Sequence, residues 1–234
     1  MNPCSKQLSI LLLIVVIYIT FRRLNPASRQ LRLWRRQFNI QTHLLTFQTV
    51  YADQNGFILS QEARKGCDAL EYTYGEIDFE SFVALLSRFK PDEHTIFYDL
   101  GSGIGTAVVA AAMVFKINKS CGIELHQSLH ECAKRIRLRL GNMPEYSVAA
   151  EHICFINNDF LQCALGDASL VFINATAFFG DFWLQISHHL EHLPTGAIVL
   201  STSKKVDSKL YSVTYNTHIK MSWGTVKVYA QQRL

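Results

Sequence analysis

A glycine-rich loop between an apolar run and a run of small residues constrains the fold of this chain more than any other feature. Residues 95–106 read TIFYDLGSGIGT, and residues 107–115 continue as a small-residue helix. Glycine lets the backbone turn sharply and approach a ligand closely, and the amino terminus of a helix presents free N–H groups. This order of strand, tight loop and helix predicts a doubly wound α/β fold.

The spacing of the loop and of the next acidic residue indicates the ligand. Asp99 begins a D-x-G-x-G-x-G pattern with Gly101, Gly103 and Gly105, which differs from the G-x-G-x-x-G of a dinucleotide site. Glu124 follows 25 residues later, where the next strand ends, and its carboxylate can accept both hydroxyls of a ribose. An ordinary strand-end acid facing solvent is the alternative for Glu124 alone. The two features together predict a site for S-adenosylmethionine.

Two later strand ends are directed to the same crevice. Residues 152–160 read HICFINNDF and end in Asp159 and Phe160, which suit an adenine amino group and an adenine ring. Residues 169–179 place Asn174 at the carboxyl end of a fourth strand. Ligands of open α/β sheets bind outside the carboxyl ends of the strands. The prediction is a Rossmann-like, seven-stranded class I methyltransferase sheet, completed by a strand at residues 196–202 and a hairpin over residues 212–221 and 225–232.

The amino terminus carries a membrane-type segment. Residues 8–21 read LSILLLIVVIYITF and are followed at once by Arg22 and Arg23. Such a helix would extend about 21 Å against a hydrocarbon core of about 30 Å, so snorkelling arginines or local thinning would have to help. The positive-inside rule predicts a membrane-anchored protein with its catalytic domain on the cytoplasmic side. A cleaved signal peptide, another targeting sequence and a helix packed on the domain stay open as alternatives.

Charge is concentrated behind this segment. Six arginines lie between residues 22 and 36, although the formal net charge of the whole chain is only +4. We therefore predict two parts: residues 1–36, with the hydrophobic segment and the arginine-rich stretch, and residues 37–234, the methyltransferase domain. The arginine-rich stretch suits an anionic lipid surface, into which Leu24, Leu31, Leu33 and Trp34 could dip, or a nucleic acid. Membrane topology is the simpler explanation.

The cysteines and histidines do not predict a metal site. The six cysteines are scattered without a C-x-x-C pair, so neither a zinc site nor a disulfide framework is expected, and we interpret them as reduced core residues. His188 and His192 share a helix face at i, i+4, but no third ligand accompanies them. A solvated helix face is the better interpretation of these two histidines.

Further segments complete an ordered set. Residues 74–76 read Y-G-E, residues 122–124 G-I-E, residues 159–161 D-F-L, residues 172–178 F-I-N-A-T-A-F, and residues 222–223 S-W. With the D-L-G-S-G-I-G loop, this set resembles the non-SET histone lysine methyltransferases known as disruptor of telomeric silencing. The resemblance spans about residues 74–230. It implies methyl transfer from S-adenosylmethionine to a lysine amine of a protein substrate, with histones among the candidates.

The resemblance also implies roles for individual residues. Tyr74 and Glu76 would hold the methionine end of the cofactor. Phe178 and Trp223, with Tyr229, would line an apolar lysine channel that favours the neutral amine, and Asn174 would present a carbonyl to orient it. No general base is assigned. The catalytic candidates are Asn174, Tyr74, Phe178 and Trp223, and the cofactor-binding candidates are Tyr74, Glu76, Asp99, Gly101, Gly103, Gly105, Glu124, Asp159, Phe160 and Asn174.

Departures from the family pattern leave other acceptors open. Ala175 and Thr176 stand where the family has an asparagine and an aromatic residue, and the family's basic nucleosome-binding extension is not visible at the carboxyl end. A membrane-associated methyltransferase of a lipid, quinone or other small amine is one alternative, and a cofactor-binding scaffold without turnover is another. A nucleic acid is not expected as the methyl acceptor, because residues 174–177 read N-A-T-A instead of N-P-P-Y or D-P-P-Y.

Overall fold

The computed structural model describes residues 26–66, 69 and 72–234. The predicted hydrophobic helix at residues 8–21 lies outside the described residues, and within them no helix has the length and apolar character needed to cross a bilayer. The chain divides into two compact units, residues 1–43 and 44–234. The predicted boundary between residues 36 and 37 stays a prediction.

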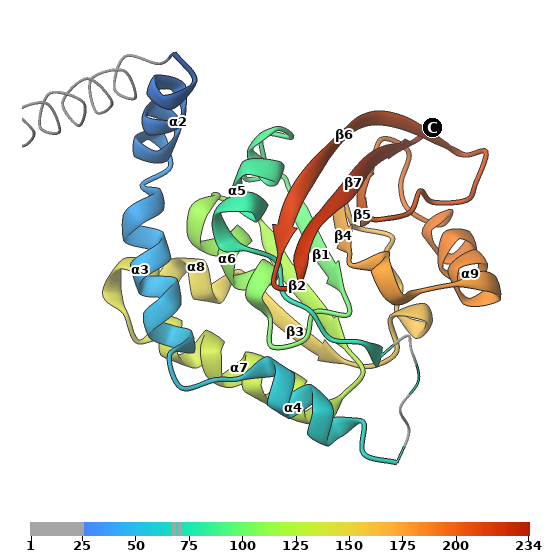
Figure 1. Ribbon diagram of the computed structural model, residues 1–234, viewed down its shortest axis with the longest axis horizontal. Coiled ribbons are helices and arrows are strands. Elements are labelled where there is room, and N and C mark those ends of the chain that lie inside the picture. The colour runs from blue at the N-terminus through green and yellow to red at the C-terminus, as the bar shows by residue number, and fades with distance from the viewer. Residues whose placement is uncertain (1–25, 67–68, 70–71) are drawn as a thin grey trace, which may run out of the picture. The chain divides into compact units, whose positions relative to one another are not determined.

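A seven-stranded mixed sheet forms the centre of the second unit (Figure 1). Its strand order is β3-β2-β1-β4-β5-β7-β6, in which the first five strands are parallel and β7 is antiparallel to β5 and β6. The strands are β1 (Ile96–Leu100), β2 (Lys119–Glu124), β3 (Ile153–Asn157), β4 (Leu170–Ile173), β5 (Ile198–Thr202), β6 (Tyr211–Met221) and β7 (Gly224–Arg233). This confirms the predicted α/β fold and each of the strands expected from the sequence.

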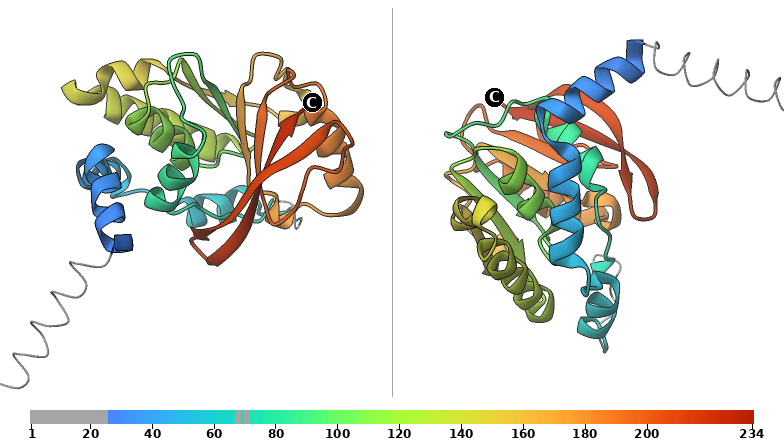
Figure 2. Two further views of the ribbon diagram at one scale, coloured as in Figure 1. Left: turned by 90° about the horizontal axis from the view of Figure 1, so that it is seen from above. Right: turned by 90° about the vertical axis from the view of Figure 1, so that its left-hand side faces the viewer.

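Helices cover both faces of the sheet because side chains alternate along each buried strand (Figure 2). On one face lie α5 (Phe79–Ser87), α6 (Thr106–Val114) and α7 (Gln127–Gly141). The Phe82 ring of α5 packs there against Phe97 of β1 and Phe172 of β4, with centroids 5.9 and 5.4 Å apart. The apolar character of α6 on all sides, in which residues 107–113 are buried, fits a helix enclosed by the sheet and α5.

The opposite face is covered by α9 (Gly180–Leu190). Trp183, Ile186 and Leu190 of this helix share a core cluster with the strand residues Tyr98 and Val171. His188 and His192 lie on the exposed side of the α9 region, as predicted, and no group of metal ligands is found within the described part of the chain.

The remaining elements are helices and 3-10 turns outside the sheet. They are α2 (Pro26–Gln37), α3 (Ile40–Tyr51), α4 (Gly56–Ala63), α8 (Ser147–Glu151) and the 3-10 turns η2 (Pro144–Tyr146), η3 (Phe160–Gln162) and η4 (Ala175–Ala177). Asn55 caps α4 by accepting a hydrogen bond from the Ile58 N–H at 3.1 Å. The Asp53–Arg139 ion pair then ties the start of this region to α7.

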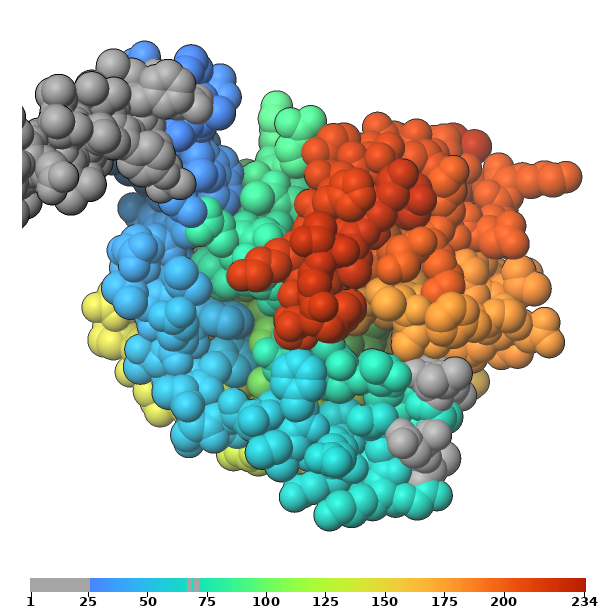
Figure 3. Space-filling view, viewed as in Figure 1, coloured from blue at the N-terminus to red at the C-terminus, as the bar shows by residue number. Residues whose placement is uncertain are grey.

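The β6–β7 hairpin lies beside the segment that precedes α5, as the red and teal surfaces in Figure 3 show. Ile77 forms a bridge to Met221, and the Asp78 N–H donates to the Lys220 carbonyl at 3.0 Å. Residues 74–78 are therefore held at the end of the sheet where the parallel strands terminate.

One sequence expectation about the cysteines is wrong. Cys121 of β2 and Cys154 of β3 are register partners with Cα atoms 4.6 Å apart, and the structure joins them as a disulfide. Cys132 and Cys163 are free. The sequence could not indicate this pair, because its two members are 33 residues apart and meet only through the register of two strands.

Candidate active site

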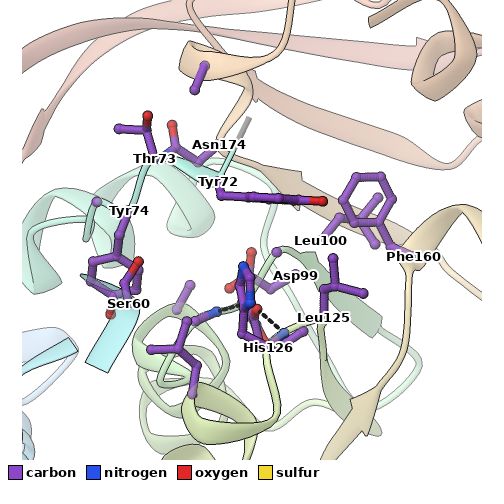
Figure 4. Close-up of a pocket in the computed structure, with 18 of the residues that line it drawn as sticks. Ser60, Tyr72, Thr73, Tyr74, Asp99, Leu100, Leu125, His126, Phe160 and Asn174 are labelled. Atoms are coloured by element: carbon purple, nitrogen blue, oxygen red, sulfur yellow. Dashed lines mark hydrogen bonds between the residues drawn. The ribbon is translucent and has the colours of Figure 1, made fainter. Parts of the chain in front are cut away.

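A pocket lies at the carboxyl ends of β1, β2 and β4, under the segment that contains residues 72–77 (Figure 4). It is lined by nine of the predicted residues: Tyr74, Asp99, Gly101, Gly103, Glu124, Asp159, Phe160, Asn174 and Phe178. The residues at the strand ends therefore meet in one pocket, as the sequence predicted. Glu76, Gly105 and Trp223 lie outside its lining.

The glycine loop forms the floor of the pocket. Gly103 has φ +56°, and a side chain there would run into the Tyr74 ring. Gly105 has φ +83° and serves as the N-cap of α6, where a side chain would meet Phe155. Both positions combine a left-handed backbone with a close neighbour, so they require glycine.

Two buried carboxyl groups lie side by side beneath the pocket. Glu124 accepts hydrogen bonds from the N–H groups of Gly103 and His126, each at 2.8 Å. Burial raises the pKa of Glu124, although these hydrogen bonds oppose the shift. Burial and the neighbouring Glu124 charge raise the pKa of Asp99 to about 8. Such a pair accepts hydrogen bonds from hydroxyl groups, and a nearby cation favours its ionised form, so it suits a nucleoside with a sulfonium and an ammonium group.

Aromatic rings enclose another side of the pocket. Phe160 and Phe178 have centroids 6.1 Å apart, and Phe178 and Phe182 lie 5.3 Å apart in an edge-to-face arrangement. Asp159 accepts a hydrogen bond from the Leu161 N–H at 2.9 Å, which keeps the turn after β3 in place. Phe182 was not predicted from the sequence, although its spacing of four residues from Phe178 could have indicated a shared surface.

Tyr74 and Glu76 form a hydrogen-bonded pair above the glycine loop. The Tyr74 hydroxyl donates to Glu76 Oε1 at 2.7 Å. Burial raises the pKa values of both groups, and the Glu76 charge adds to the effect on Tyr74. Trp223 packs against Gly75 on the other side of this loop. Glu76 thus orients Tyr74, and Trp223 supports the loop from behind.

Asn174 and Phe178 lie on the η4 side of the pocket. Asn174 Oδ1 accepts a hydrogen bond from the Thr202 hydroxyl at 2.8 Å, so its side-chain carbonyl is directed to β5. Tyr229 does not line the pocket, and its ring lies 5.5 and 5.0 Å from the ammonium groups of Lys205 and Lys227. Of the aromatic residues expected in a lysine channel, Phe178 alone lines the pocket.

Several lining residues had no sequence signal. Ser60 reaches the pocket from α4, and Met221 from the end of β6. Figure 4 shows the Tyr72 ring between Asn174 and His126, with its hydroxyl directed towards Phe160. Tyr72 and His126 meet edge to face at 5.1 Å. None of these residues belongs to a motif, and only the tertiary fold brings them together at the pocket.

Comparison with known proteins agrees with this geometry. Residues 64–229 match the family model described as "Histone methylation protein DOT1". The chain belongs to the DOT1 family. This confirms the resemblance seen in the sequence, and the match begins just before the Tyr74–Glu76 loop and includes every predicted site residue.

The DOT1 relatives are much longer than this chain. An H3 lysine-79 specific histone-lysine N-methyltransferase of Caenorhabditis elegans is 30% identical over 62% of this chain, which corresponds to 16% of the relative. A protein of the same name from Kluyveromyces lactis is 22% identical over 67% of this chain and 28% of its own length. The chain therefore spans less than a third of these relatives.

Solved structures support the fold. The Escherichia coli protein YjhP has a TM-score of 0.56 at 13% identity, covering 75% of this chain and 99% of its own. An S-adenosylmethionine-dependent methyltransferase of Thiobacillus denitrificans, in complex with S-adenosylhomocysteine, has a TM-score of 0.53 at 14% identity over 74% of this chain and 96% of its own. The match to the DOT1 family and the donor set of the pocket identify S-adenosylmethionine as the cofactor.

Proposed function

We propose that this chain transfers a methyl group from S-adenosylmethionine to a lysine amine of a protein, with histone H3 as the first candidate. The observation that carries this proposal is the composition of one pocket. Tyr74, Asn174 and Phe178, which belong to the segments typical of the DOT1 family, line the same cavity as Asp99 and Glu124. The relatives are named as H3 lysine-79 methyltransferases, and this makes histone H3 the first candidate for the methyl acceptor. The acceptor is a proposal because this chain spans less than a third of the length of these relatives.

The described side chains suit an in-line displacement. The sulfonium cofactor supplies an activated methyl group. The protein has to bind the cofactor, align it with the amine and exclude water. Asp99 and Glu124 supply oxygen acceptors at the cofactor side, and a cation bound beside them favours the ionised form of both buried carboxyl groups. Deprotonating a lysine at neutral pH costs roughly 4 to 5 kcal/mol. The Phe178 ring, with Phe182 packed against it, lowers this cost because an apolar wall disfavours the ammonium ion.

A membrane-associated methyltransferase of a small amine or lipid is the second candidate. Ala175 and Thr176 replace residues of the family motif within η4, next to the pocket residue Asn174. Because these replacements lie outside the motifs that predict the cofactor site, they favour a different methyl acceptor over a different cofactor. A scaffold that binds the cofactor without turnover is the third.

Labelling experiments separate the three candidates. The full-length chain is incubated with radiolabelled S-adenosylmethionine and, separately, with nucleosomes, cell extract or extracted lipids. Gly103→Arg serves as the inactive variant, because a side chain there enters the space of Tyr74. Gly166→Arg is its matched control, since no atom lies within 4 Å of a Cβ at that position.

Each outcome selects one candidate. Methyl-lysine in a protein band that disappears with Gly103→Arg and persists with Gly166→Arg supports the proposal, and label in histone H3 identifies its substrate. Label in lipid alone would reject protein lysine as the acceptor. Cofactor binding without label in any fraction would favour the scaffold.

We further propose that the protein lies at a membrane surface with the methyltransferase domain on the cytoplasmic side. The uncharged stretch at residues 8–21 supports this, and so does the distribution of residues on α2. Ala27, Leu31 and Trp34 share one helical face, and arginines occupy the other. Leu31 is 43% exposed, and α2 contains no acidic residue.

Trp34 fluorescence tests this placement. The difference between the emission of the native chain and of Trp34→Phe isolates the signal of one indole. A blue shift with vesicles containing phosphatidylserine, quenched by brominated lipid, would support an interfacial α2. An unchanged signal, or a shift with double-stranded DNA only, would assign the arginine-rich stretch to another partner. Removal of residues 8–21 during expression in cells would identify that segment as a targeting sequence.

A further inference from the structure

The end of β5 holds the η4 turn through a connected set of hydrogen bonds. The Thr202 hydroxyl lies 2.8 Å from Asn174 Oδ1 and 3.1 Å from the Thr176 hydroxyl, which in turn lies 3.0 Å from the Ser203 hydroxyl. Lys204 Nζ donates to the carbonyls of Ala175 and Thr176 at 2.8 and 3.0 Å. Three consecutive residues of one strand end thus fix the turn that carries Asn174.

The number of hydroxyl protons sets the direction of this chain of bonds. A hydroxyl has one proton, and Thr202 uses it for Asn174 Oδ1, which can only accept. Thr176 must therefore donate to Thr202, and Ser203 must donate to Thr176. With Asn174 Oδ1 as the acceptor, Thr202 and Thr176 each donate and accept one of these hydrogen bonds, and Ser203 donates at the start of the set. Thr202 has no exposed surface, so water cannot replace its hydroxyl.

The orientation of the Asn174 amide decides which groups this side chain offers to the pocket. Its Oδ1 is occupied by Thr202, and within the described part of the chain its Nδ2 group makes no hydrogen bond to protein. Two N–H donors are therefore left for a ligand. A lysine amine needs its lone pair for attack on the methyl group, so a donor aimed at that nitrogen would oppose the reaction. An oxygen acceptor of the cofactor is the better partner for these N–H groups.

We infer that Thr202 is a positioning residue, whose hydroxyl holds the Asn174 amide so that its N–H groups serve as hydrogen-bond donors to the bound cofactor. The inference rests on the proposed function only in that the pocket binds S-adenosylmethionine. It also gives Thr176 a role. This residue departs from the aromatic residue of the family pattern, and its hydroxyl supplies the donor that Thr202 needs.

Calorimetry with S-adenosylhomocysteine and the full-length chain tests this role without any methyl acceptor. Thr202→Val keeps the shape of the side chain and removes the hydroxyl, and we expect about 5- to 10-fold weaker binding, as the loss of one buried hydrogen bond implies. Thr202→Ser keeps the hydroxyl and should bind within about twofold of the native chain. Thr176→Val should weaken binding in the same direction and by a smaller factor.

A double-mutant cycle separates positioning from general damage to the fold. If Thr202 acts through Asn174, then Thr202→Val should weaken binding no further in an Asn174→Ala background. Asn174→Asp keeps an acceptor for Thr202 but removes the donors, so it should lose affinity even where Thr202 is intact. Fully additive losses, or native affinity in Thr202→Val, would overturn the inference. Native affinity in Asn174→Asp would overturn the donor assignment. A missing label on histones affects none of these measurements.

Discussion

The indole ring of Trp223 occupies the position that a side chain on Gly75 would take. The neighbouring residues strengthen this contact, because the Glu76 N–H donates to the Ser222 hydroxyl at 3.1 Å and the Ser222 N–H donates to the Glu76 carbonyl at 2.8 Å. The loop that carries Tyr74 and the turn of the β6–β7 hairpin therefore form one structural unit, although they are 146 residues apart.

Gly75→Ala should disrupt this unit by steric conflict alone, because Gly75 has no left-handed backbone that an alanine would strain. Inserting a methyl group into a packed contact costs about 1 to 3 kcal/mol. Since the displaced loop carries Tyr74, we expect at least about tenfold weaker binding of S-adenosylhomocysteine. Calorimetry measures the affinity, and tryptophan emission reports the displacement of Trp223.

A matched glycine and a compensating variant control this experiment. Gly166→Ala has no atom within 4 Å of the new Cβ and should leave affinity and emission unchanged. Gly75→Ala combined with Trp223→Ala should recover part of the lost affinity, because the smaller side chain leaves room for the methyl group. Native affinity in Gly75→Ala would show that the loop and the hairpin move independently.

Asp99 should make the stability of the ligand-free protein depend on pH. Its pKa rises to about 8 in the folded chain because of burial and the Glu124 charge, against about 3.9 in an unfolded chain. The folded protein therefore holds a proton that the unfolded chain lacks between these values. This contribution is fully present below pH 4 and is lost as the pH rises to 8, by at most about 1.4 kcal/mol per pH unit.

Asp99→Asn removes this titration. Urea unfolding at pH 5, 6, 7 and 8 without cofactor should show a shallower decline of the free energy of unfolding than in the native chain. Some decline should remain, because burial also raises the pKa values of Glu76 and Glu124. Parallel curves for the two proteins would mean that Asp99 is ionised in the free protein. The variant should also bind S-adenosylhomocysteine more weakly, since its amide cannot ionise beside the ammonium group of the ligand.

The sequence predicted the polar residues of the site because strand ends are local features. Asp99, Glu124 and Asn174 each close an apolar run, and parallel strands bring such residues to one edge of a sheet. The positions of the other residues in and around the pocket were harder to predict from the sequence. The position of Trp223 outside the pocket depends on how the hairpin packs on Gly75, and Ser60 arrives from a helix without a motif. These are contacts between distant segments, which periodicity and spacing do not specify.

The Cys121–Cys154 disulfide should make the stability of the protein sensitive to reductants. Closing a loop between residues 33 positions apart stabilises a fold by about 3 to 4 kcal/mol in the chain-entropy model. Addition of a reductant should therefore lower the urea midpoint of the native chain. Peptide mapping without reduction should recover the two cysteines in one linked peptide pair.

Two variants separate this bond from other thiol effects. In Cys121→Ser combined with Cys154→Ser the urea midpoint should be low and independent of reductant. Cys163→Ser changes a free cysteine and should respond to the reductant as the native chain does. Free thiols at positions 121 and 154 in protein purified without reductant would contradict the bond.

Phe160 should contribute more to cofactor affinity than Phe182, although both line the pocket. Phe160 follows Asp159 at the end of β3, where we expect the adenine ring, whereas Phe182 lies in α9 behind Phe178, with its centroid 5.3 Å from that ring. A lost aromatic contact is worth about 0.5 to 1.5 kcal/mol beyond its buried area, so Phe160→Ala should weaken S-adenosylhomocysteine binding about tenfold.

Phe182→Ala should weaken binding only about threefold, because its effect on the cofactor passes through Phe178. Phe89→Ala is the control, since this ring packs on Tyr215 with centroids 6.4 Å apart and does not line the pocket. Competition calorimetry with adenosine tests the assignment further. If Phe160 contacts the adenine, Phe160→Ala should weaken adenosine and S-adenosylhomocysteine by the same factor. A loss for S-adenosylhomocysteine alone would place Phe160 at the methionine end and reverse the orientation that we assign to the cofactor.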